Sequence, residues 1–141
     1  MINISFDQID KELRKAGYPF EKATNQKIET GECRQYYQFK KVIDAALPYT
    51  ELVVVFTKCT DNPLKIFTGL RFITRNEETF YALKTQCTSE ENISLESEAA
   101  KDGSVIWTYK KGNYTFVFDN GNDSNGKVYM LDVLYNSAIK N

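Results

Sequence analysis

The chain has 141 residues, of which 42% are hydrophobic and 26% are charged, and it contains no histidine. This length and composition predict a single globular domain over residues 1–141 and are too apolar for intrinsic disorder. Histidine is the commonest general base and a frequent metal ligand, so its absence excludes Ser-His-Asp catalysis, Cys-His catalysis and histidine-ligated zinc. The formal net charge of −1 lacks the basic excess of a dedicated nucleic-acid binder.

The first predicted element is a helix that begins after Ser5 and ends at Gly17. Ser5 and Gln8 have the spacing of a capping box, in which each residue satisfies a backbone N–H of the other. Glycine terminates helices readily because it adopts positive φ without strain. The apolar residues of this helix recur on one side: Phe6, Ile9 and Leu13. We therefore expect the helix to lie against a sheet.

The next segments are less distinctive. Residues 21–32 are polar and show no apolar period, which predicts a loop. A helical spacing follows in Tyr36, Phe39, Ile43 and Leu47, although the alternation of Cys33, Tyr37 and Phe39 also suits a strand. Pro48 favours the helix, because helices tend to end before a proline. We therefore predict a second helix that ends near Leu47.

After Pro48 the chain reads as β-structure. Six runs rich in β-branched and aromatic residues follow one another, at 51–59, 64–74, 79–87, 104–110, 113–119 and 127–135. The first two form a predicted hairpin, and the last is apolar on both faces, as in a central strand. The predicted fold is α+β, with an N-terminal helix or helices packed on a curved antiparallel β-meander of about six strands. No internal repeat is visible.

One segment is strongly acidic. Residues 77–102 contain seven acidic and two basic residues. Such a run often marks only a solvated loop, but it also suits a surface that steers a basic partner. The candidate partner-binding residues are Glu77, Glu78, Glu90, Glu91, Glu96 and Glu98.

Other site signatures are missing from the sequence. The Asn- and Asp-rich segment 119–126 does not fit the EF-hand template in any register, and no phosphate-binding glycine loop is present. We therefore predict no catalytic residue, no metal site and no cofactor. Cys33, Cys59 and Cys87 are expected to be free, mostly buried thiols in a reducing compartment, with a single bridge as the alternative.

Neither an export signal nor a membrane-spanning run is recognisable, so the sequence predicts a cytoplasmic protein with no membrane partner. Together these features predict a non-enzymatic protein-binding module whose partner is a protein of basic charge rather than a nucleic acid. The specific form we expect is a bacterial immunity protein that neutralises a cognate toxin by occlusion. The alternative is a carrier or sensor of a small apolar ligand, with an aromatic-lined pocket between sheet and helices. The oligomeric state is left open.

Overall fold

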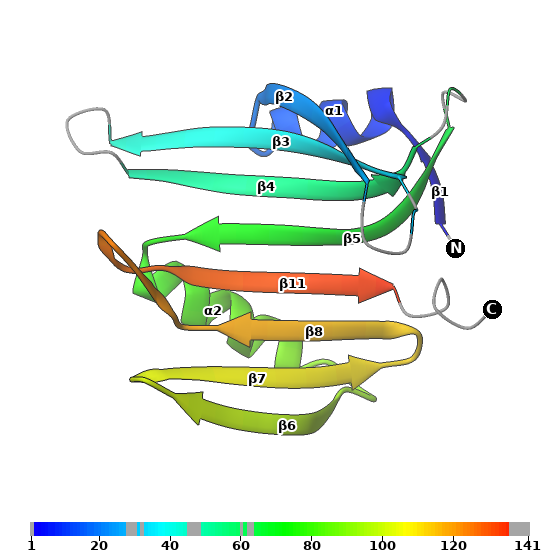
Figure 1. Cartoon of the computed structure of the whole chain (residues 1–141). Helices are drawn as coiled ribbons and strands as arrows, with labels where there is room; N and C mark the ends of the chain where they lie inside the picture. Colours follow the sequence, from blue (N-terminus) through cyan, green and yellow to red (C-terminus); the bar gives the residue numbers. More distant parts are fainter. Residues whose placement is uncertain are drawn as a thin grey trace.

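The computed structural model describes residues 2–27, 31, 33–44, 49–59, 61 and 64–135 (Figure 1). The fold is α+β with a large antiparallel sheet. In chain order its elements are β1 (Ile2–Ser5), α1 (Phe6–Lys15), β2 (Phe20–Lys27), β3 (Cys33–Asp44), β4 (Tyr49–Lys58), β5 (Leu64–Thr74), α2 (Glu77–Thr88), β6 (Ser94–Lys101), β7 (Ser104–Lys111), β8 (Tyr114–Asp119), β9 (Asn122–Asp123), β10 (Gly126–Lys127) and β11 (Tyr129–Tyr135).

Nine strands form one antiparallel sheet in the order β2-β3-β4-β5-β11-β8-β7-β6, with β1 beside β5. Strands β9 and β10 form a separate two-stranded ribbon. The order reads as two antiparallel meanders, β2–β5 and β6–β11, which meet at their last strands (Figure 1). Each meander is preceded by a helix, so two units of the same element order share the sheet. No similarity between the two halves of the sequence indicates this internal repetition.

Both helices begin with a side-chain cap. The capping box of α1 is confirmed, since Ser5 Oγ accepts a hydrogen bond from the Gln8 backbone N–H at 3.2 Å. Helix α2 uses Asn76, whose Oδ1 accepts from the Thr79 N–H at 3.0 Å. In each helix the buried residue stands four positions after the cap, Ile9 in α1 and Phe80 in α2. This shared position anchors both helices on the sheet.

Both helices pack on the same face of the sheet, which is the far side in Figure 1. The core lies between them and the sheet and consists of Ile9, Tyr37, Phe39, Val53, Val55, Phe72, Phe80, Phe118, Tyr129 and Leu131. In the described part of the chain no helix covers the opposite face, which we call the uncovered face. Within the described residues, the sheet therefore has one face packed against helices and one face that no helix covers.

The structure corrects the predicted second helix. Residues 33–44 form strand β3, while Leu47 lies outside the described residues. Tyr37 and Phe39 are buried and point to the helix side of the sheet, whereas Tyr36 lies on the other face. The alternation of period two was the decisive pattern, and the helical spacing of the aromatic residues was coincidental.

Three further segments differ from prediction. Residues 79–87 belong to helix α2 and not to a strand, because Asn76 caps the helix and Phe80 anchors it. Residues 20–27 form strand β2 and not a loop, and residues 94–101, within the acidic segment 77–102, form strand β6. Both strands lie at the edges of the sheet and are exposed along their whole length, so they show no apolar alternation. The strand count consequently exceeds the predicted six.

Other predictions are confirmed. Strands β4 and β5 form the expected hairpin, with Val53 opposite Phe72. Strand β11, predicted as central because it is apolar on both faces, lies between β5 and β8. Neither helix of the described chain is long and apolar enough to cross a membrane.

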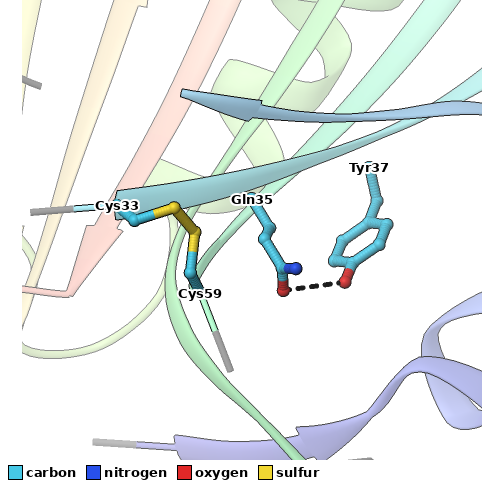
Figure 2. Close-up of a disulfide and its surroundings, with 4 residues drawn as sticks. All are labelled: Cys33, Gln35, Tyr37 and Cys59. Atoms are coloured by element: carbon cyan, nitrogen blue, oxygen red, sulfur yellow. Dashed lines mark hydrogen bonds between the residues drawn. A yellow bond between two sulfur atoms is a disulfide. The ribbon is translucent and has the colours of Figure 1, made fainter. Parts of the chain in front are cut away.

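Cys33 and Cys59 form a disulfide, which corrects the expectation of free thiols for these two residues (Figure 2). They occupy the next register position after the Arg34–Lys58 pair, and their Cα atoms are 5.3 Å apart. The antiparallel pairing of β3 with β4 brings them together, which no spacing in the sequence reveals. Cys87, on α2, is a free thiol.

Candidate functional site

The six predicted partner-binding residues lie on helix α2, in the turn that follows it and on strand β6. Glu77 and Glu78 form its first turn, and Glu90 and Glu91 lie in the turn that follows its end. Glu96 and Glu98 belong to the edge strand β6. All six are exposed. Since the helix has 12 residues, about 18 Å of axis separates the two pairs at its ends. We call these six residues the acidic surface.

Two members of the acidic surface are engaged by neighbouring side chains. Lys111 Nζ lies 2.5 Å from Glu90 Oε2, and Trp107 Nε1 donates a hydrogen bond to Glu98 Oε1 at 2.6 Å. The other four have neither an ion pair nor a hydrogen bond within the described residues: Glu77, Glu78, Glu91 and Glu96. Their carboxylates are therefore available to a partner. Glu77 and Glu78 also interact favourably with the positive end of the helix dipole.

The basic residue of α2 is held by aromatic rings. Lys84 Nζ lies 4.5 Å from the centroid of Trp107, and it is 3.4 Å from Tyr109 Oη. Trp107 therefore contacts Lys84 through its ring face and Glu98 through its indole N–H. This arrangement holds the charge of Lys84 against the sheet, and within the described residues Lys84 forms no ion pair with the acidic surface. Nothing in the sequence spacing predicts it.

A buried carboxylate links the two helical units. Glu51, on β4, is 5% exposed, and its Oε2 accepts a hydrogen bond from Thr74 Oγ1 at 2.7 Å. Its Oε1 accepts from Tyr18 Oη at 3.1 Å. The Thr74 hydroxyl in turn accepts from the backbone N–H of Asn76, the cap of α2. Each carboxylate oxygen thus has a donor, as burial requires, and the chain of bonds connects the segment after α1 to the beginning of α2.

Burial and charge raise the pKa of two tyrosines in this region. The pKa of Tyr18 rises to about 12, because burial penalises the phenolate and the Glu51 carboxylate repels it. Burial also raises the pKa of Tyr129, with smaller contributions from Glu77 and Tyr81. Both tyrosines are neutral at physiological pH and act as hydrogen-bonding or packing groups.

The aromatic side chains available to line the alternative ligand pocket lie on both faces of the sheet. Tyr36 lies on the uncovered face, where its ring packs edge-on against Phe56 with centroids 5.2 Å apart. Phe39 and Phe118 are fully buried in the core. Tyr109 packs against Phe118 at 5.8 Å between centroids. Those on the helix side pack against one another and against the helices: Tyr37, Phe39, Trp107, Tyr109, Phe116 and Phe118.

The described residues contain no group of three or more Cys, Asp and Glu side chains placed to hold a metal ion. Comparison of the chain with protein-family models, with curated proteins and with solved structures gives no significant match.

Proposed function

We propose that this protein is a non-enzymatic protein-binding module that recognises a basic partner through the acidic surface. The observation that carries the proposal is the set of four exposed carboxylates of the acidic surface with no ion pair in the described chain. Opposite charge on a partner accelerates encounter and fixes its orientation.

The distribution of charge along the chain supports a partner of positive charge. Residues 76–141 contain ten acidic and six basic residues, whereas residues 1–75 contain nine acidic and twelve basic ones. The small net charge therefore conceals two halves of opposite sign. A basic partner is attracted to the half that carries α2 and β6.

The specific form of the proposal is an immunity protein that occludes a basic toxin. We further propose that it works in an oxidising compartment and not in the cytoplasm expected from the sequence. The support is the Cys33–Cys59 disulfide, since such bonds persist in secreted and periplasmic proteins and are rare in the cytosol.

The test is the association rate with a partner obtained by affinity capture, measured by surface plasmon resonance over a range of salt concentrations. The variant is the double substitution Glu91→Lys, Glu96→Lys, which avoids the first turn of α2 and its dipole. We expect its association rate to fall about tenfold or more and its salt dependence to flatten.

The matched control is Glu12→Lys, Asp61→Lys, which changes the net charge equally at exposed positions outside the acidic surface. The proposal predicts a smaller effect for this control. Equal rates for the two double variants would show that only net charge matters and would refute a localised acidic surface.

A further inference from the structure

The uncovered face has an apolar centre. The strand registers align three rows of side chains across it, and the apolar members of these rows come from four adjacent strands. They are partly buried in the single chain: Leu52, Val54, Phe56, Ile73, Met130, Leu134 and Val117. Gly69 lies in the same face, where a Cβ atom would stand 3.1 Å from Phe56 Cδ2 and from the Val133 carbonyl oxygen. The face is therefore closely packed at this point, and no side chain projects from position 69.

An ion pair occupies the middle of this face. Arg71 on β5 and Asp132 on β11 are register partners, and Arg71 donates two hydrogen bonds to the carboxylate, at 2.7 and 2.9 Å. The Arg71 side chain is 41% exposed. Val54 flanks Arg71 and Val117 flanks Asp132 in the same row. Across the centre the row therefore reads valine, cation, anion, valine.

This row of side chains is complementary to the same row of a second copy. If a second sheet is stacked face to face with a twofold axis parallel to the central strands, Arg71 of one copy lies opposite Asp132 of the other. The same operation places Val54 opposite Val117. A twofold axis of this kind gives a closed, isologous dimer, which is the commonest form of soluble oligomer.

Charge at the ends of the face favours the same axis. On β2–β4, four basic residues share the face with Glu21: Lys22, Arg34, Lys40 and Lys58. On β8 and β11 it carries Asp119 and Asp132, and on β7 and β6 it carries Lys110 and Lys101. An axis parallel to the strands sets the basic end of one copy against this balanced half of the other and keeps the two basic ends apart.

The area is sufficient for a stable interface. Eight strands at about 4.8 Å spacing and three rows at about 6.7 Å spacing cover about 770 Å². A standard protein interface buries about 800 Å² on each partner.

We propose that the occupant of the uncovered face is a second copy of this chain, packed sheet to sheet. In this dimer the helices and the acidic surface point outward on both sides. The proposal is therefore independent of the proposed function, and either one can fail without the other.

The experiment measures molar mass by sedimentation equilibrium on the oxidised full chain. The wild-type protein is expected at twice the mass of the chain. Arg71→Asp alone places four carboxylates at the centre of the dimer, and Asp132→Arg alone places four guanidinium groups there. Each variant is expected at the monomer mass. An equimolar mixture of the two is expected to restore the dimer, because the two carboxylates of one variant then face the two guanidinium groups of the other.

A dimer recovered in the mixture shows that both variants fold, since an unfolded chain would not restore a defined dimer. The matched control is the Asp10–Arg14 ion pair of α1, which lies on the helix side. Arg14→Asp and Asp10→Arg should remain dimeric. A monomeric wild-type protein, or a mixture of two folded variants that stays monomeric, would overturn the proposal.

Discussion

Thr57 shows how a single buried hydroxyl can cost stability. Its side chain is fully buried on β4, and its Oγ1 has no hydrogen-bond partner within the described residues. A buried hydroxyl without a partner loses its hydration and gains nothing in return. Thr74, equally buried, donates to Glu51 and accepts from the Asn76 N–H.

We predict that Thr57→Val stabilises the protein by about 1 kcal/mol, because the methyl group replaces an unsatisfied hydroxyl at nearly constant volume. Thr74→Val is the matched comparison and should destabilise by about 1–3 kcal/mol, since it leaves a buried carboxylate oxygen without its donor. Urea unfolding of both variants provides the measurement. A loss of stability in Thr57→Val equal to that in Thr74→Val would contradict this assignment.

The raised pKa of Tyr18 predicts a dependence of stability on pH. The tyrosine proton leaves the unfolded chain near pH 10 but stays on the folded protein until about pH 12. Between these values the unfolded state binds fewer protons, so the free energy of unfolding falls as pH rises. The contribution of Tyr18 is complete below pH 10 and is lost by about pH 12.

Urea unfolding from pH 8 to pH 11.5 therefore should show a steeper decline for the wild-type protein than for Tyr18→Phe. Below pH 10 the variant is expected to be the less stable protein, because it lacks the bond to Glu51. Parallel curves over the whole range would show that Tyr18 ionises equally in both states.

Among the secondary-structure elements, those with strong local signals were predictable from the sequence. The capping box at Ser5 predicted α1, and the alternating runs predicted β4, β5, β8 and β11. The wrong secondary-structure predictions share a physical cause, because tertiary contacts and not local propensity determine the structure of these segments. Thr79, Phe80 and Tyr81 favour strands by intrinsic propensity, yet the Asn76 cap and the burial of Phe80 make this segment helical. Edge strands β2 and β6 carry no buried face and hence no pattern.

The disulfide joins two elements that are distant in sequence. It closes a loop with a separation of 26 residues between β3 and the end of β4. In the chain-entropy description, a loop of this length stabilises the folded state by about 3.5 kcal/mol. We predict that Cys33→Ser, Cys59→Ser lowers the free energy of unfolding by about that amount in chemical denaturation. Cys87→Ser, at a free thiol on α2, is the comparison, and an equal loss there would argue against the disulfide as the cause.

For the molecule as a whole, the acidic residues were predictable as candidates, but their arrangement was not. Composition singled out residues 77–102. The sequence could not show that the carboxylates of this segment are divided between a helix and an edge strand. The uncovered face was also invisible, because it depends on both helices packing on one side of a sheet shared by two units. Long-range strand pairing, as between β5 and β11, leaves no local signal in a sequence.

The central claim is that a protein partner binds at the acidic surface around α2. Hydrogen–deuterium exchange of the protein, alone and with a captured partner, tests it most directly because exchange reports protection along the whole chain. We predict that protection on binding is concentrated in residues 77–98. Protection confined to β2–β4, with residues 77–98 unchanged, would contradict the account.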